Sequence, residues 1–208
     1  MENNVAECVI FDMDGTLLDS ERLCNQALLD TIPEINIPLD ELICMFGGRR
    51  LAWMFDQIES RFDCVLPENI EQIYRTRVSE LFETDLCAFP GVRDVLATLT
   101  VPYCIATSAP RTKVMHALKK TQLSEFFKDR IFSSYDIGSW KPDPGIFLHA
   151  AHQMNISAQN CLVVEDSEAG IQAAKSANMR VIQFCGALTQ PIHDEFFKSY
   201  YDFPIPVS

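Results

Sequence analysis

Two aspartates that directly follow a short apolar run are the residues with the clearest potential for chemistry. Asp12 and Asp14 stand one residue apart after the run 9–11, and Gly15 and Thr16 follow them. If the run is a strand, the loop at its end can turn both carboxylates toward one point. Carboxylates held together repel each other, so such a point favours a divalent cation with oxygen ligands, above all Mg²⁺.

The same segment has simpler interpretations. Asp and Gly are frequent in turns, and Asp19 or Ser20 could cap a helix that begins after them. A calcium loop of the EF-hand type needs glycine at its sixth position, whereas Gly15 is the fourth residue counted from Asp12. A catalytic role therefore requires that other parts of the chain bring polar groups to the same place.

The rest of the chain predicts an α/β fold with an inserted helical block. Residues 20–86 show helical spacing of apolar residues and no convincing strand, whereas strands and helices alternate from residue 88 onward. Such alternation is typical of a parallel sheet with crossover helices. We expect a Rossmann-like, doubly wound parallel sheet in a discontinuous core of residues 1–18 and 88–208, and a helical cap domain of residues 19–87. The expected strands span 7–11, 103–106, 131–132, 161–164 and 181–184.

In an open parallel sheet, ligands bind beyond the carboxyl ends of the strands. A polar cluster follows each of the first four expected strands. Because parallel strands end at the same edge of the sheet, these four clusters should meet there. The clusters are Asp12 with Asp14, Thr107 with Ser108, Lys141 in Lys-Pro-Asp-Pro, and Glu165 with Asp166 before Ser167.

These four clusters, in this order, resemble the four motifs of the haloacid dehalogenase-like superfamily. Asp-x-Asp-Gly-Thr resembles its first motif. Lys-Pro-Asp-Pro and Val-Glu-Asp-Ser-x-x-Gly-Ile-x-Ala-Ala resemble the β-phosphoglucomutase-like branch, whose helical cap is inserted after the first motif. Within that branch, residues 133–144 and the run around Asn160 resemble bacterial phosphatases of 6-phosphogluconate. The resemblance extends over most of the chain.

The resemblance implies a role for each motif residue. Asp12 would attack phosphorus and become an aspartyl phosphate, and Asp14 would act as the general acid and base. Thr107 would give its hydroxyl to a phosphate oxygen, and Lys141 would neutralise charge between the nucleophile and the phosphoryl group. Ser108, at a position where family members usually carry Asn, is a candidate contact to the substrate phosphate.

The resemblance also implies a Mg²⁺ site. Its ligands would be the Asp12 carboxylate, the Asp14 backbone carbonyl and Asp166, with Glu165 supporting bound water. These are the oxygen ligands that Mg²⁺ prefers.

The cap has its own candidate segment, Gly47-Gly48-Arg49-Arg50. It could be a plain helix–helix turn with two exposed arginines. By resemblance, this loop reaches over the active site, where Gly48, Arg49 and Arg50 would bind substrate, and two guanidinium groups suit a remote carboxylate or phosphate. Mutase relatives carry lysine where Gly47 stands, so its absence favours hydrolysis.

The sequence therefore predicts a Mg²⁺-dependent hydrolase of phosphate monoesters, acting on small phosphorylated metabolites such as sugar or sugar-acid phosphates, 6-phosphogluconate among them. A phosphomutase of the β-phosphoglucomutase type is one alternative, and a non-catalytic phosphate-binding module is another. True dehalogenases and phosphonatases lack the second aspartate, so Asp14 disfavours both.

Composition limits the partners. The net charge is −12, with 29 acidic and 17 basic residues and no basic run, so we expect neither nucleic acid nor a membrane surface as partner. Eight cysteines form no Cys-x-x-Cys pair, and no secretory leader is visible at the first residues. We expect free thiols, a cytoplasmic location and a monomer, with an oligomer left open.

Overall fold

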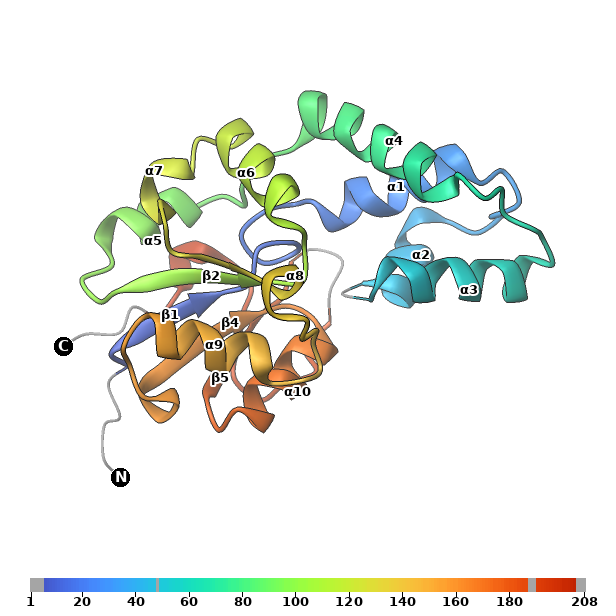
Figure 1. Ribbon diagram of the computed structural model, residues 1–208. Coiled ribbons are helices and arrows are strands. Elements are labelled where there is room, and N and C mark those ends of the chain that lie inside the picture. The colour runs from blue at the N-terminus through green and yellow to red at the C-terminus, as the bar shows by residue number, and fades with distance from the viewer. Residues whose placement is uncertain (1–5, 48, 187–189, 205–208) are drawn as a thin grey trace.

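A parallel six-stranded sheet forms the centre of the protein in the computed structural model, which describes residues 6–47, 49–186 and 190–204 (Figure 1). The strand order is β3-β2-β1-β4-β5-β6, so the first strand in sequence lies in the middle of the sheet. Its neighbours pair with it in parallel, Phe11 opposite Ile105 on β2 and opposite Val164 on β4. The strands are β1 (Cys8–Phe11), β2 (Tyr103–Thr107), β3 (Ile131–Ser133), β4 (Cys161–Glu165), β5 (Arg180–Phe184) and β6 (Phe196–Phe197).

Helices cover both faces of this sheet, as near-continuous apolar strands require. Alternate residues of β1 point to opposite faces: Ile10 joins the core under α9 and α10, while Val9 and Phe11 join the core on the other side. Figure 1 shows α9 and α10 below the sheet and α5, α6 and α7 above it. These helices are α5 (Val92–Thr98), α6 (Arg111–Lys120), α7 (Ser124–Phe127), α9 (Gly145–Gln153) and α10 (Glu168–Ser176). The expected Rossmann-like fold is confirmed.

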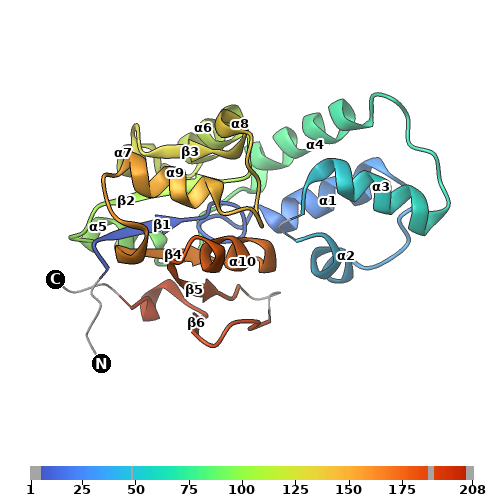
Figure 2. The same cartoon turned by 60° about the horizontal axis from the view of Figure 1, so that its bottom comes forward.

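Four helices between β1 and α5 form a separate block at one end of the sheet (Figures 1 and 2). The two connections to this block run side by side, because Leu18 bridges Ala88 and the Asp19 amide donates to the Cys87 carbonyl at 3.0 Å. The block occupies the stretch expected for a cap, and the boundaries at 18/19 and 87/88 stay a prediction. Its helices are α1 (Glu21–Thr31), α2 (Leu39–Phe46), α3 (Leu51–Phe62) and α4 (Ile70–Asp85).

The start of α1 differs from the simple capping interpretation of the sequence. Neither Asp19 nor Ser20 caps α1 through its side chain; the Ser20 hydroxyl donates to Asp14 instead. Asn178, just beyond the end of α10, takes the left-handed conformation at φ 56°, which asparagine tolerates. β6 lies at the edge of the sheet, where it pairs with β5.

All eight cysteines are free, and four of them are buried. Among the described residues, no helix combines the length and the apolar character needed to cross a lipid bilayer.

Candidate active site

The polar clusters converge at the carboxyl edge of the sheet. Asp12 directly follows β1, Thr107 ends β2, and Glu165 ends β4. Lys141 comes from the loop between α8 (Ser134–Ile137) and α9. All four residues line one cavity of about 390 Å³. Sheet topology therefore brings together side chains up to 153 positions apart, as the sequence predicts.

Lys141 links the two buried carboxylates of Asp12 and Glu165. Its Nζ lies 2.5 Å from Asp12 Oδ1 and 2.6 Å from Glu165 Oε1, and only 5% of its side chain is exposed. Burial acts to lower the pKa of Lys141, but the two carboxylates outweigh it and raise the pKa, so this lysine is charged. The ammonium is therefore fixed beside the Asp12 oxygen.

Burial raises the pKa of Asp12 to about 8, although Lys141 opposes this shift. The negative charge of the neighbouring Glu165 raises the pKa of Asp12 further. Burial is also the main cause that raises the pKa of Asp166 well above its ordinary value, and the charges of Glu165 and Asp12 add to it. These shifts reflect negative charges that one lysine only partly offsets. A nearby divalent cation would favour the ionised forms.

Three carboxylates could hold such a cation. Oxygens of Asp12, Glu165 and Asp166 lie within 4.8 Å of one another. With all three ionised beside Lys141, the local charge is −2, which suits a divalent metal with oxygen ligands. Thr16 donates to Asp166 Oδ1 at 2.8 Å and orients it. Gly15, at φ +79°, makes room, because a Cβ there would overlap the Asp166 carboxylate.

Asp14 lies in the same cavity but faces different partners. The Ser20 hydroxyl donates to its Oδ1 at 2.5 Å, and Lys113 Nζ donates to its Oδ2 at 2.9 Å. Its carboxylate is not among the three clustered ones, and a metal contact through its backbone carbonyl stays a prediction. Two aspartates that are near neighbours in sequence thus have separate lysine partners.

Thr107 is buried, and its hydroxyl accepts from the Ala109 amide at 3.1 Å. That hydroxyl can still donate its own proton into the cavity. Ser108 lines the cavity beside it and is only partly buried.

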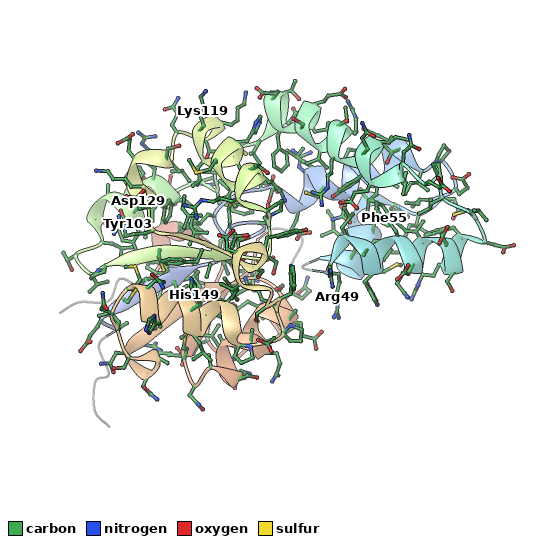
Figure 3. All side chains as sticks on the ribbon, viewed as in Figure 1. Arg49, Phe55, Tyr103, Lys119, Asp129 and His149 are labelled. Atoms are coloured by element: carbon green, nitrogen blue, oxygen red, sulfur yellow. The ribbon has the colours of Figure 1, made fainter. Side chains whose placement is uncertain are left out.

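Residues of the helical block also line the cavity. Arg49 lies at the end of the block nearest the core (Figure 3). Arg49 lies 3.6 Å from Glu168 of α10 and stacks over Trp53, while the Arg50 guanidinium lies 4.8 Å from the Trp140 ring centroid. Both arginines therefore face the cavity and contact the core. Gly48, the third residue expected to bind substrate, lies outside the described residues.

Sequence reasoning missed Lys113 and considered Ser20 only as one of two residues that could cap a helix. Lys113 reads as an ordinary residue of an amphipathic helix, since nothing in its spacing links it to an aspartate 99 positions earlier. The available signal was its place in the first turn of α6, directly after the loop that follows Thr107 at the end of β2.

Comparisons with known proteins agree with this geometry. A family profile described as haloacid dehalogenase-like hydrolase matches residues 9–184. The 6-phosphogluconate phosphatase of Escherichia coli (strain K12) is 38% identical over 182 residues, covering 86% of this chain and 82% of the relative. The β-phosphoglucomutase of Bacillus subtilis (strain 168) is 28% identical over 192 residues, covering 83% of this chain and 80% of the relative.

A solved structure shares the architecture. A haloacid dehalogenase-like protein from Agrobacterium tumefaciens str. C58 superposes with a TM-score of 0.85 at 31% identity, and the match covers 96% of each chain. Its likeness extends over both the sheet and the helical block. The family profile spans most of the sequence, and Lys141 contacts the Asp12 carboxylate at the carboxyl edge of the sheet. This chain therefore belongs to the haloacid dehalogenase-like hydrolases.

Proposed function

We propose that this hydrolase is a Mg²⁺-dependent phosphatase of small phosphorylated metabolites, sugar or sugar-acid phosphates in particular. The observation that carries the proposal is the Asp12 carboxylate, held 2.5 Å from Lys141 at the carboxyl edge of the sheet. An oxygen nucleophile beside a fixed ammonium suits attack on a phosphate, because phosphoryl transfer depends chiefly on positioning and charge stabilisation. The name of the E. coli relative supports this substrate class.

In the first half-reaction, a carboxylate oxygen of Asp12 attacks phosphorus, and the bond from phosphorus to the ester oxygen breaks. Asp14 gives its proton to the departing oxygen, which leaves as the alcohol. Lys141 stabilises the charge that gathers between nucleophile and phosphoryl group, and the Thr107 hydroxyl donates to a phosphoryl oxygen. The product on the enzyme is an aspartyl phosphate at Asp12.

In the second half-reaction, a water molecule attacks the same phosphorus. Asp14, now a carboxylate, takes a proton from this water, and the bond from phosphorus to the Asp12 oxygen breaks. Inorganic phosphate leaves, and both aspartates return to their starting states. Two easier displacements thus replace one difficult displacement.

The acidic cluster fits Mg²⁺, which Asp12, Asp166 and the Asp14 carbonyl would hold, with Glu165 alongside. When bound, the ion reduces repulsion between the carboxylates and the substrate phosphate. We extend the proposal to the cap, residues 19–87, where Arg49 and Arg50 would bind the far end of a substrate such as 6-phosphogluconate. A cytoplasmic, monomeric enzyme is the form in which we expect it to act.

Phosphate release tests the proposal directly. With Mg²⁺, we expect inorganic phosphate from 4-nitrophenyl phosphate and from members of a panel of sugar and sugar-acid phosphates, and none when EDTA replaces the metal. Asp12→Asn removes the nucleophile and should reduce release to background, whereas Asp129→Asn, at an exposed site, should not change it. Release that persists in EDTA, or full activity in Asp12→Asn, contradicts the mechanism.

The alternatives give different outcomes in the same assays. A phosphomutase would convert a sugar phosphate to an isomer and would require a bisphosphate activator. A binding module would retain a phosphate ester without releasing phosphate from any member of the panel.

A further inference from the structure

Lys113 lies on a helix that packs on the sheet, and it contacts Asp14, the second aspartate of the site. It stands in the first turns of α6, and its Nζ lies 2.9 Å from Asp14 Oδ2. Lys141, by contrast, contacts Asp12 and Glu165. Among the ion pairs of the described residues, Lys113 provides the one that includes Asp14. Each of the two aspartates therefore has its own lysine.

Ser20 and Lys113 together hold both oxygens of the Asp14 carboxyl group. Ser20 Oγ lies 2.5 Å from Oδ1, and Lys113 Nζ lies on the other oxygen. Two contacts on two oxygens fix the orientation of the carboxyl plane, which a single contact would leave free to turn. The lysine can donate to Oδ2 whether Asp14 is ionised or carries a proton on Oδ1, and a hydroxyl can donate or accept. The arrangement is therefore compatible with both protonation states.

The Lys113 ammonium is itself held in place by the helical block. Its Nζ lies 3.7 Å from Cys24 Sγ on α1 and 5.4 Å from the centroid of the Phe82 ring on α4. These residues also line the cavity. Contacts from α1 and α4 thus restrict the ammonium of a core helix, and this limits the positions from which it can bind Asp14.

We propose that Lys113 is a positioning residue for the acid step: it fixes the Asp14 carboxyl group so that the proton on Oδ1 meets the departing ester oxygen. The inference rests on the proposed function of Asp14. Proton transfer by a well-placed acid increases a reaction rate about 10²–10⁴-fold, and an acid that is no longer well placed loses part of this rate increase. An alkoxide needs that proton, whereas 4-nitrophenolate leaves readily without it.

The test compares kcat/KM for two leaving groups, because kcat/KM includes cleavage of the ester bond and excludes the later attack by water. In Lys113→Met, we expect about a 100-fold loss on the best sugar-acid or sugar phosphate and less than about a 10-fold loss on 4-nitrophenyl phosphate. Lys113→Arg, which keeps a cationic donor, should recover most of the loss. Lys119→Met, at an exposed position of the same helix, should match the wild type on both esters.

A double variant separates positioning from a general loss of structure. Asp14→Asn should show the same selective loss on the alkyl ester, and adding Lys113→Met to it should cost nothing further, because both changes remove one function. Equal losses on both esters, no loss, or a further loss in the double variant would overturn the role of Lys113. If Lys113→Met does not fold, as judged by its thermal melt, Lys113→Gln provides the same comparison.

The two proposals fail in different ways. Wild-type protein that releases no phosphate in the presence of Mg²⁺, or an Asp14→Asn variant as active as wild type on the alkyl ester, contradicts the proposed function. An active wild type with a leaving-group-selective Asp14→Asn, but an unselective Lys113→Met, contradicts the positioning role alone.

Discussion

The nucleophile of the proposed reaction is a buried acid among other acids. Asp12 is 6% exposed and lies beside Glu165 and Asp166, with Lys141 as its cationic partner. An ionised carboxylate there is costly without a metal, because burial and like charges both disfavour it. This cost makes the stability of the metal-free protein depend on pH.

Replacing Asp12 with Asn should stabilise the metal-free protein at alkaline pH. The pKa of Asp12 rises from its ordinary value of 3.8 to about 8 on folding, so the folded state binds this proton more tightly than the unfolded chain. The stabilisation from that proton is complete below about pH 4 and is lost as pH rises through about 8. In EDTA, the free energy of unfolding of Asp12→Asn should exceed that of wild type at pH 8, and the difference should shrink toward pH 5. A pH-independent difference between the two proteins in urea denaturation would refute this.

The sequence predicted where most site residues lie, because they follow a simple rule: polar residues at the carboxyl ends of parallel strands meet at one edge. Asp12, Thr107, Glu165 and Asp166 obey that rule, and their catalytic roles stay predictions. Lys113 does not obey it. Its contact with Asp14 depends on how α6 rotates against the sheet and on how closely α1 and α4 approach, and no local pattern encodes either quantity.

The turn from β4 into α10 shows how one element carries the acidic cluster. Glu165 Oε2 accepts from the Ser167 amide at 2.7 Å, and the Ser167 hydroxyl accepts from the Gly170 amide at 3.1 Å, which caps α10. Glu165 Oε1 meanwhile binds Lys141. A Cβ at Gly170 would overlap the Glu165 side chain, so this glycine lies directly against the carboxylate.

Gly170→Ala should therefore destabilise the protein even though alanine favours a helix over glycine by about 1 kcal/mol. Glu165 is held at both oxygens and cannot move aside freely, so overpacking should cost about 1–3 kcal/mol and reduce turnover. Denaturant unfolding and phosphate release measure the two effects. Gln172→Ala, at an exposed position of α10, is the matched control and should leave both unchanged. Wild-type stability and turnover in Gly170→Ala would show that the Glu165 carboxylate is not fixed.

Several of the shortest elements escaped prediction, although the three-residue strand β3 did not. The buried strands and the longer helices give clear periodic patterns. α7 and α8 have four residues each and β6 has two, which is too few to show a period. Each of them nevertheless buries a residue, Phe127 in α7, Ser134 in α8 and Phe197 in β6, so their positions depend on tertiary packing.

An ion pair and a cation–aromatic contact connect the helical block to the core across the cavity. Arg49 pairs with Glu168, and Arg50 stacks on Trp140. These contacts are exposed to solvent in part, so each contributes little to stability by itself. Both guanidinium groups are thus available to exchange these partners for an anionic ligand.

Arg49→Ala and Arg50→Ala should therefore change substrate preference more than stability. A charge-assisted hydrogen bond is worth about 1.5–3 kcal/mol, so each change should lower kcat/KM on 6-phosphogluconate about 10–100-fold more than on 4-nitrophenyl phosphate. Steady-state kinetics on both esters measures this. Arg61→Ala, an exposed arginine at the far end of α3, should have no effect on either ester. Equal losses on both esters would mean that the arginines support the fold and do not select substrate.

One hydrogen bond joins nearly opposite ends of the sequence. The hydroxyl of buried Tyr200 donates to the Thr16 carbonyl at 3.0 Å, which braces the loop that carries Asp14 and Gly15. During synthesis β1 is made before its partners β2 and β4 and before Tyr200. The acidic loop can therefore gain this support only after translation has passed Tyr200, and a chain cut before that residue would lack it.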